Sequence, residues 1–530
     1  MVTREYGDLA GAGGVKDVTV QLSRSLAAWT GRSVHVVMPC YGFIDPEIHG
    51  FSLMYHPDSA DQPLTFEVDM NYTAEERRET LQVWYSRAAR VHVYLLDSPR
   101  FREKGDVYTY TAREQEFDPL KRQGEGHYDY FAMNLLLQKA AIKLMLRLDE
   151  KPDVIHCHDG HTAVLPAIIR ETPWLRGQFG NTGFLVTVHN GGIGYHQDVA
   201  DLPFAKAMTG LPERVIMAGR LGGSFDPFVT AGMYATLNTV SENYARELQE
   251  SDEDAQTGWL GHRLLDMGKR LEGVTNGIDP RIFDPKRGEE LGLAASFDPL
   301  DDSTMQGKQQ CKVSLLGELA EGATVERVRK YGFLNNNLRC PLLTFIGRLS
   351  TQKGVDIMHD AALEMILRKM DFQLVIVGSG TTEIERNLIA LAEREESRGR
   401  ICFLSGYDPW WANKVYSSGD FFLVPSRYEP CGLTDFIAQL FGNLPIVHHV
   451  GGLIKVEDER TGFAYMDNSP ASLLEAVSRA LARSEDPKLI REMQKNAVQT
   501  IERKYTWKVV KNKYLQLYRK AIIEATSRQS

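Results

Sequence analysis

One carboxylate in this sequence lies where ligand sites form in many α/β proteins. Glu429 falls in D-F-F-L-V-P-S-R-Y-E-P-C-G-L-T, residues 420–434, after an apolar run that predicts a buried strand over Phe421–Pro425. The following P-C-G segment predicts the start of a helix. Parallel α/β sheets bind ligands at the carboxyl ends of strands, beside helix N-termini. By position alone, Glu429 is equally well explained as a charge that stabilises a helix N-terminus.

Two cations follow another predicted strand. Arg348 lies at the end of the predicted strand Leu342–Leu349, and Lys353 lies five residues further on, before a predicted helix over Val355–Leu367. Arginine offers a fork of donors and lysine a point charge, so together they suit a diphosphate. A solvated loop is the alternative interpretation. Because no D-x-D pair stands at a predicted strand end here, we expect a leaving nucleotide diphosphate to be neutralised without a metal.

The first half of the chain has a glycine loop and several polar strand ends. Gly13 and Gly14 precede a predicted helix whose apolar residues follow helical spacing. Glycines let the backbone approach a ligand closely, and a helix N-terminus favours an anion, although a tight turn without a ligand is equally consistent. The candidate ligand-binding residues of this half are Gly13, Gly14, Asp17, Asp159, His161, His189 and Asn190.

Three histidines in H-C-H-D-G-H raise the possibility of a zinc site. His156 and His158 would share one face of a strand, whereas the following turn moves His161 elsewhere, and no fourth ligand is evident. We therefore expect no metal. His189 is explained either as a contact to a polar ligand or as a loop histidine satisfied by the protein.

Predicted strands and helices alternate in two series, which is typical of α/β proteins with parallel sheets and predicts two Rossmann-like domains. Before the first series, Met1–Glu5 supplies only the tail of a strand, so the first strand is short or the chain starts late. The first series has a long helix over Gly124–Leu148 and strands at Ser33–Pro39, Phe66–Met70, Val91–Leu96, from Asp153, Gly183–Asn190 and Tyr234–Val240. The second series has strands at Leu342–Leu349, Gln373–Gly380, Ile401–Ser405, Phe421–Pro425 and Pro445–His448.

A turn-rich segment separates the two series. V-T-N-G-I-D-P-R-I-F-D-P contains Asn-Gly and Asp-Pro turns, which suit a domain boundary. We expect a first domain at 1–272, a hinge at 273–285 and a second domain at 286–504, followed by a basic amphipathic helix over Tyr505–Ile523. Two such domains predict parallel sheets that face each other across a ligand cleft.

The composition excludes several classes of function. The chain has 530 residues, too many for one hydrophobic core, and a formal net charge of −9. This charge argues against binding of nucleic acid or of an anionic membrane, since both need a basic face. No apolar run approaches the length of a membrane span, and no signal peptide is visible. The 6 scattered cysteines include no C-x-x-C pair, so we expect reduced thiols and a cytoplasmic protein.

Short motifs spread over the chain match those of one enzyme family. The first half has G-A-G-G-V-K-D-V at 11–18, H-C-H-D-G-H at 156–161, T-V-H-N at 187–190 and N-G-I-D at 276–279. The second half has G-R-L-S-T-Q-K-G at 347–354, P-S-R-Y-E-P-C-G-L-T at 425–434, G-G-L at 451–453 and T-G-F at 461–463. With these motifs the chain resembles the bacterial and plant glycogen/starch synthase family, retaining glucosyltransferases of the two-domain GT-B fold.

The resemblance implies a retaining glycosyltransferase without a cofactor. It would transfer glucose from a nucleotide-glucose, usually ADP-glucose, to the non-reducing end of an α-1,4-glucan. The catalytic group would consist of Arg348, Lys353, Glu429 and His189. In it, Arg348 and Lys353 would bind the diphosphate, and Glu429 would bind the hydroxyls of the donor sugar. The substrate-binding positions carried over are Gly13, Gly14, Asp17, Asp159, Asn190, Asn276, Cys431, Gly432, Leu433 and Thr434, and the final helix within 505–530 would pack back on the first domain.

Three departures from the family motifs bear on donor binding. Gly11 and Ala12 replace the lysine and threonine of K-T-G-G, which removes a cation near the donor phosphates. Gly160 replaces the tryptophan of H-D-W-H, and His448 with His449 stand where arginines often precede G-G-L. Histidines in place of permanent cations predict stronger donor binding at lower pH.

Other functions stay open at this stage. A related GT-B transferase could use UDP-glucose or another donor and acceptor. A catalytically impaired, glucan-binding regulatory protein could keep the fold without turnover.

Overall fold

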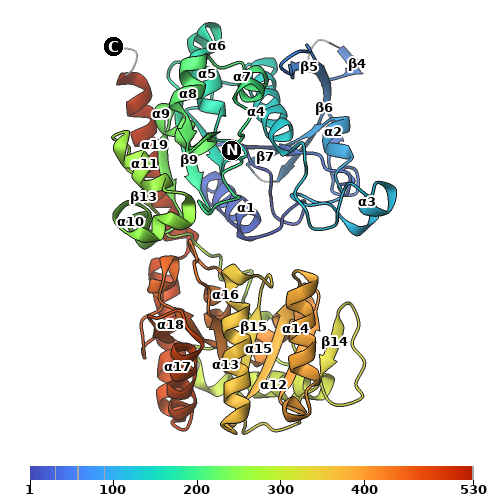
Figure 1. Cartoon of the computed structure of the whole chain (residues 1–530), viewed down its shortest axis with the longest axis vertical. Helices are drawn as coiled ribbons and strands as arrows, with labels where there is room; N and C mark the ends of the chain where they lie inside the picture. The colour runs from blue at the N-terminus through green and yellow to red at the C-terminus, as the bar shows by residue number, and fades with distance from the viewer. Residues whose placement is uncertain (30, 57–58, 89, 528–530) are drawn as a thin grey trace. The chain divides into compact units, whose positions relative to one another are not determined.

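The computed structural model describes residues 1–29, 31–56, 59–88 and 90–527, which form two compact units. Unit 1 consists of Met1–Gly277 with Trp507–Ser530, and unit 2 consists of Ile278–Thr506. In each unit, helices cover a central sheet (Figure 1). No helix in the described part of the chain is long and apolar enough to cross a membrane.

Unit 1 contains strands β1 to β13 and helices α1 to α11 and α19. The strands are β1 (Val34–Pro39), β2 (Ser52–Leu53), β3 (Tyr55–His56), β4 (Ser59–Pro63), β5 (Thr65–Asp69), β6 (Arg78–Ala88), β7 (Val91–Asp97), β8 (Val154–His158), β9 (Gly183–Val188), β10 (Arg220–Leu221), β11 (Ser224–Phe225), β12 (Thr236–Thr239) and β13 (Glu272–Gly273). The helices are α1 (Gly14–Ala27), α2 (Pro99–Arg102), α3 (Ala112–Phe117), α4 (Tyr130–Arg147), α5 (Leu165–Glu171), α6 (Pro173–Gln178), α7 (Leu202–Thr209), α8 (Glu213–Ala218), α9 (Pro227–Tyr234), α10 (Glu242–Glu250), α11 (Leu260–Asp266) and α19 (Trp507–Ser527).

The N-terminal segment joins the two halves of the unit 1 sheet. Val2 forms parallel bridges with Val37 of β1 and with Cys157 of β8. It thereby connects the path β13-β12-β9-β8 to the path β1-β7-β6-β2. The short first strand expected from the sequence is therefore this central segment. Because the strand order reverses beside it, the residues after Val2 and after β8 lie at a topological switch point, where α/β sheets bind ligands.

The unit 1 sheet is mixed, which differs from the parallel sheet predicted. The predicted strands at β1, β7, β8 and β9 are confirmed. β1, β8 and β9 pair in parallel with their strand or bridge partners, whereas β7 is parallel to β1 and antiparallel to β6. However, the strand predicted at Phe66–Met70 is β5, which pairs antiparallel with β6. β6 was not predicted because many of its side chains are polar and exposed, so it lacks the continuous apolar run of a buried parallel strand. The strand predicted over Tyr234–Val240 is shortened to β12, since Tyr234 ends α9.

The C-terminal helix α19 packs within unit 1. Trp507 Nε1 donates to Gln21 Oε1 of α1 at 2.8 Å, and Tyr518 is hydrogen-bonded to His156 of β8 at 2.9 Å. Gly183 of β9 allows this packing because a Cβ there would lie 2.7 Å from the backbone of Ala521. The last helix thus covers the sheet that positions the first-half candidates.

Unit 2 contains strands β14 to β20 and helices α12 to α18. The strands are β14 (Arg329–Gly332), β15 (Leu342–Ile346), β16 (Gln373–Gly378), β17 (Ile401–Ser405), β18 (Phe421–Val424), β19 (Leu444–His448) and β20 (Phe463–Tyr465). The helices are α12 (Gln306–Glu318), α13 (Val355–Leu367), α14 (Thr382–Glu393), α15 (Pro409–Ser418), α16 (Thr434–Leu440), α17 (Pro470–Arg483) and α18 (Pro487–Lys504). All five strands predicted in this unit are present, whereas β14 and the short β20 were not predicted.

The strand order of unit 2 is that of a Rossmann-like sheet. The order is β14-β17-β16-β15-β18-β19-β20, and the neighbours from β17 to β20 are parallel while β14 is antiparallel. The chain moves outward in one direction from β15 to β17 and then in the other from β18 to β20. The switch point therefore lies between the carboxyl ends of β15 and β18, where Arg348, Lys353 and Glu429 follow.

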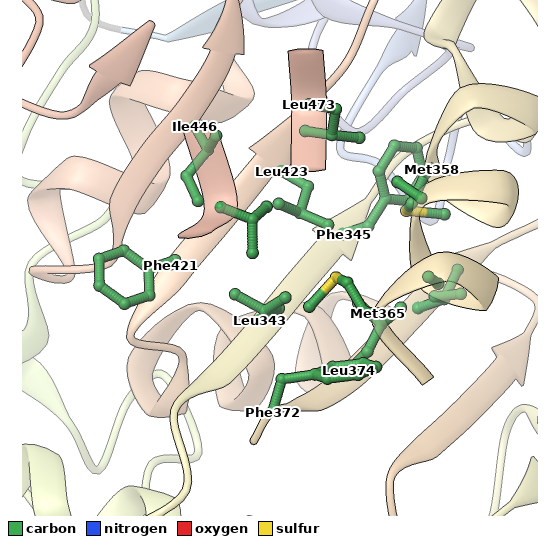
Figure 2. Close-up of a cluster of buried hydrophobic side chains, with 14 of the residues drawn as sticks. Leu343, Phe345, Met358, Met365, Phe372, Leu374, Phe421, Leu423, Ile446 and Leu473 are labelled. Carbon is green, nitrogen blue, oxygen red and sulfur yellow. The ribbon is translucent and has the colours of Figure 1, made fainter. Parts of the chain in front are cut away.

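Strands β15 to β19 of unit 2 are buried along their whole length, which explains their continuous apolar sequences. Leu343 and Phe345 of β15 pack in a cluster with Met358 and Met365 of α13 and with residues of α17 (Figure 2). Leu342 and its neighbours on the other face join a second cluster with α12 and α15. These two layers hold the strand ends in fixed positions.

Candidate active site

The structure brings Glu429 and Lys353 together at the switch point of unit 2. Lys353 Nζ lies 2.5 Å from Glu429 Oε2, and Ser426 Oγ donates to the same oxygen at 2.9 Å. Burial alone would raise the pKa of Glu429, but the Lys353 charge and these hydrogen bonds hold that pKa below its ordinary value. Glu429 is therefore an ionised, fixed acceptor rather than a proton donor.

A glycine holds Lys353 close to this carboxylate. Lys353 ends a 3₁₀ turn that begins after Ser350, whose hydroxyl accepts from the Lys353 backbone N–H. Gly354 follows with φ +67°, and a Cβ there would lie 1.9 Å from the carbonyl oxygen of Pro425. Only glycine permits this approach of the turn to the end of β18. Arg348 follows the same strand as Lys353, and its side chain is exposed.

The segment after Glu429 is a loop, which corrects the helix start predicted from P-C-G. Helix α16 begins at Thr434, and Gly432 before it has φ +73°, a left-handed conformation that interrupts helical geometry. Gly451 and Gly452 pack against this loop, since Cβ atoms there would lie 2.1 Å from the Glu429 carbonyl oxygen and 2.2 Å from that of Cys431. The G-G motif is thus explained by the close approach of two backbones.

In unit 1, Asp159 organises the loop after β9. Its Oδ1 accepts from the backbone N–H groups of His189 at 2.6 Å and Asn190 at 3.3 Å. Asp159 has φ +59° and is buried, and burial raises its pKa to about 8 despite those two hydrogen bonds. The predicted residues Asp159, His189 and Asn190 therefore lie together, with Asp159 fixing the backbone of the other two.

The histidines of unit 1 form a buried, neutral group. A hydrogen bond of 2.9 Å joins His158 Nδ1 to His189 Nε2, and another of 2.7 Å joins His156 Nε2 to Thr187 Oγ1. Burial lowers the pKa of His189 to about 3 and lowers those of His156 and His158 as well. His161 instead stacks on Tyr108, with ring centroids 5.1 Å apart. Among the described residues, no group of three or more histidine, cysteine or acidic side chains is arranged to hold a metal ion.

The glycine loop of unit 1 contacts a carboxylate of its own unit. Glu5 Oε2 accepts from the backbone N–H groups of Ala12 at 2.9 Å and Gly13 at 3.2 Å. Tyr108 donates to the other oxygen of Glu5 at 2.5 Å. The Gly13 N–H expected to face a sugar phosphate therefore donates to Glu5 in this structure. Gly14 begins α1.

Two other predicted residues also belong to unit 1. Asp17 is in the first turn of α1, and burial raises its pKa to about 6. Asn276 is buried, and its Oδ1 accepts no hydrogen bond from the described part of the protein. A buried amide oxygen without a partner is costly unless a ligand or water satisfies it, so Asn276 is a suitable ligand contact.

The comparisons with known proteins decide the family. A family model described as the starch synthase catalytic domain matches residues 1–275, and one described as glycosyl transferases group 1 matches residues 340–483. The chain belongs to the glycogen and starch synthase family. It is 31% identical to a glycogen synthase of Anaeromyxobacter sp. (strain Fw109-5) over 93% of both chains, and 28% identical to that of Geotalea uraniireducens (strain Rf4) over 98% of both.

The solved structures show the fold of this glycogen and starch synthase family member. The catalytic domain of starch synthase IV from Arabidopsis thaliana, bound to ADP and acarbose, matches with a TM-score of 0.78 and 23% identity over 98% of both chains. A sucrose-phosphate synthase from Thermosynechococcus elongatus matches with a TM-score of 0.55 and 18% identity over 99% of this chain and 98% of that one. The two Rossmann-like units are those of the GT-B fold, and the chain is a glycosyltransferase of the class that moves glucosyl groups from a nucleotide sugar to a glucan.

The structure explains two departures of this family member. Gly160 does not leave an open space where the tryptophan would stand, because a Cβ there would lie 2.3 Å from the His196 carbonyl oxygen. The backbone of Tyr195 and His196 occupies that space. His448 places its two ring nitrogens 2.8 Å from the Ser426 carbonyl oxygen and 3.0 Å from that of Met466, so its ring joins the end of β18 to the end of β20.

Sequence reasoning missed several residues of this site. Ser426 donates to Glu429, Glu5 accepts from the backbone N–H of Gly13, and Lys455 donates to the carbonyl oxygen of Gly432. Ser426 could have been found as the first polar residue after the apolar run of β18. Lys455 gave no signal, because a lysine in a charged loop normally predicts a solvated side chain.

Proposed function

We propose that this chain transfers glucose from ADP-glucose to the non-reducing end of an α-1,4-glucan with retention of configuration. The observation that carries the proposal is the Lys353–Glu429 pair at the switch point of unit 2, which places a cation for phosphate beside an acceptor for sugar hydroxyls. Relatives named glycogen synthase align over nearly the whole chain, and the similar plant starch synthase was solved with ADP.

In unit 2, the proposed roles follow the chemistry of each group. Arg348 and Lys353 bind the diphosphate and stabilise the negative charge that develops as it leaves. Glu429 accepts hydrogen bonds from donor-sugar hydroxyls, because it is ionised and held by Ser426 and Lys353. The backbone N–H groups of Cys431, Gly432 and Leu433 complete the sugar contacts, and Thr434 binds near the phosphates.

In unit 1, the polar residues after β8 and β9 act on the glucosyl group. His189 is neutral, so it can donate or accept a hydrogen bond without adding charge, and Asp159 fixes its backbone. Asn190 and Asn276 offer amide groups to sugar hydroxyls. We also propose substrate contacts for Asp17, Gly13 and Gly14. The Gly13 N–H can bind the substrate only after Glu5 releases it.

The proposed reaction needs no covalent enzyme intermediate. The bond between the anomeric carbon and the phosphate oxygen breaks as the acceptor hydroxyl attacks from the same face. The leaving phosphate oxygen takes the hydroxyl proton, so the products are the extended glucan and the nucleoside diphosphate. The protein supplies position and charge stabilisation through Arg348 and Lys353.

The test is nucleotide release with glycogen as acceptor. We expect glucan-dependent release of ADP from ADP-glucose, faster than release of UDP from UDP-glucose, and α-configured linkages in the product by NMR. A Glu429→Ala variant serves as the inactive control. Faster release from UDP-glucose would favour a related transferase with another donor, and β-linkages would contradict retention.

A second candidate is a glucan-binding protein that has lost turnover. The contact between Glu5 and the glycine loop favours it, together with the absence of a lysine at Gly11. This candidate predicts glycogen binding without nucleotide release above that of the Glu429→Ala variant from either donor.

A further inference from the structure

A buried lysine lies under the loop that follows Glu429. Lys455 ends the 3₁₀ segment Gly451–Lys455, and its side chain is only 4% exposed. Its Nζ donates to the carbonyl oxygens of Cys431, of Gly432 at 2.9 Å and of Gly452 at 3.1 Å. One ammonium group thus binds both carbonyls of the Cys431–Gly432 turn and ties them to the G-G motif.

The carbonyl contacts of Lys455 determine where two N–H groups of the loop point. A trans peptide is planar, with its C=O and N–H on opposite sides, and the described chain has no cis peptide. Because the carbonyls of Cys431 and Gly432 are directed at Lys455, the N–H groups of Gly432 and Leu433 are directed away from it. In the described residues, neither N–H donates to another group of the protein.

Lys455 is held in place by a counter-ion of the same unit. Its Nζ lies 3.1 Å from Asp435 Oδ1, and Asp435 is fully buried in the first turn of α16. The same Nζ lies 4.4 Å from the centroid of the Phe436 ring. Burial raises the pKa of Asp435 to about 6, while Lys455 opposes that increase. A Cβ on Gly432 would lie 2.7 Å from Asp435 Oδ1, so the loop fits this pair only with glycine at that position.

We propose that Lys455 is a positioning residue for the donor sugar. By holding the carbonyls of Cys431 and Gly432, it orients the N–H groups of Gly432 and Leu433 for hydrogen bonds to the glucosyl group. This inference rests on the proposed function of the loop as the sugar-binding part of the donor site. It predicts that Lys455 affects the binding of a nucleotide sugar. Binding of the nucleoside diphosphate alone should not depend on Lys455, because Arg348 and Lys353 bind the diphosphate.

Unit 2 also provides a matched control for this residue. Lys308 is a second buried lysine, and its Nζ donates to the carbonyl oxygens of Ser417 and Phe441 at 3.0 Å each. Those carbonyls lie outside the proposed donor loop. Lys308→Met therefore removes the same chemical group at a position outside the donor loop. It shows how the loss of a buried lysine affects the stability of the protein, separately from any effect on the donor loop.

The test compares two ligands by calorimetry with the full chain. ADP-glucose and ADP are titrated into the wild type, Lys455→Met with Asp435→Asn, and Lys308→Met. The double variant removes both charges, so it leaves no unpaired buried carboxylate. Loss of two oriented hydrogen bonds predicts an affinity for ADP-glucose about tenfold lower in the double variant, with the affinity for ADP changed less than about twofold. Lys308→Met is expected to leave the ratio of the two affinities unchanged.

Each outcome decides the proposal. An equal loss of affinity for both ligands, or no loss for either, would overturn the positioning role. Wild-type chain that releases no nucleotide would contradict the proposed function, yet the ratio of affinities would still test Lys455. Wild-type chain that binds neither ADP-glucose nor ADP would overturn both.

Discussion

Lys353 Nζ and Glu429 Oε2 lie 2.5 Å apart although the two residues are separated by 76 positions in the chain. They meet because β15 and β18 are neighbours at the switch point of the unit 2 sheet. The pair is buried on the carboxylate side and partly exposed on the lysine side. A buried carboxylate therefore has its charge balanced while the cation keeps access to a ligand.

Glu429→Gln is expected to lower kcat/KM for the nucleotide-glucose by about 100-fold, because glutamine loses the charged acceptor for the sugar hydroxyls. Lys353 and Ser426 would then face a neutral amide. The measurement is the rate of nucleotide release over a range of donor concentrations, with the thermal unfolding curve as a control for folding. A folded variant with wild-type kcat/KM would show that the carboxylate does not act on the donor.

The sequence predicted strands β15 to β19 of unit 2 well because all their residues are buried. Ile401–Ser405 has the predicted bounds, since each of its residues is buried and the apolar run stops at the end of the strand. The mixed edge of unit 1 was not predicted, because β6 mixes exposed polar and buried residues and has no turn signal that fixes its partner. The periodicity of apolar residues indicates which side chains are buried, and the antiparallel strands β5 and β6 are only partly buried.

The candidate site was predictable only where strand ends mark it. Lys353 and Glu429 each follow a recognisable strand, so their place at the strand ends could be predicted, whereas position alone left two interpretations of Glu429. The contact of Glu5 with Gly13 joins a carboxylate to backbone N–H groups, and no side-chain pattern predicts such a contact. The contacts of Lys455 are equally unpredictable from the sequence, because its partners are main-chain carbonyls whose positions depend on the packing of two loops.

Asp159→Asn is expected to make unfolding of unit 1 less dependent on pH. The pKa of Asp159 is raised from 3.8 to about 8 in the folded state, so folding favours its protonated form. The stability from this group is complete below about pH 4 and is lost as pH rises toward 8. The unfolding temperature of Asp159→Asn should therefore rise relative to that of the wild type between about pH 5 and 8.

The measurement for Asp159 is thermal unfolding of both proteins in buffers of equal ionic strength. Asparagine keeps an oxygen that can accept from the N–H groups of His189 and Asn190, so the loop contact is preserved. Other raised carboxyl groups, such as Asp17 and Asp435, titrate in both proteins and cancel in the difference. A difference that is constant over this pH range would contradict the prediction.

Gly160→Trp is expected to destabilise unit 1 rather than to restore a family contact. A Cβ at this position would lie 2.3 Å from the His196 carbonyl oxygen, so even Gly160→Ala must displace the 195–196 backbone. Overpacking of this kind costs about 1–3 kcal/mol, and tryptophan should cost more than alanine. Denaturant unfolding of both variants gives the measurement. An unchanged free energy of unfolding for Gly160→Ala would show that the loop moves freely.

Lys16 is expected to supply part of the charge that Gly11 lacks. A Cβ on Gly11 would lie 2.5 Å from the Cβ and Cδ atoms of Lys16, so the stem of Lys16 occupies the space in which a side chain at position 11 would begin. If its ammonium group serves the donor phosphates, Lys16→Met loses about 1 kcal/mol of binding, which raises KM for the nucleotide-glucose about fivefold. This difference should shrink as salt is added, because Lys16 is only partly buried and salt screens a charge that solvent reaches. A KM for Lys16→Met equal to that of the wild type at low salt would show that donor binding in this chain relies on Arg348 and Lys353 alone.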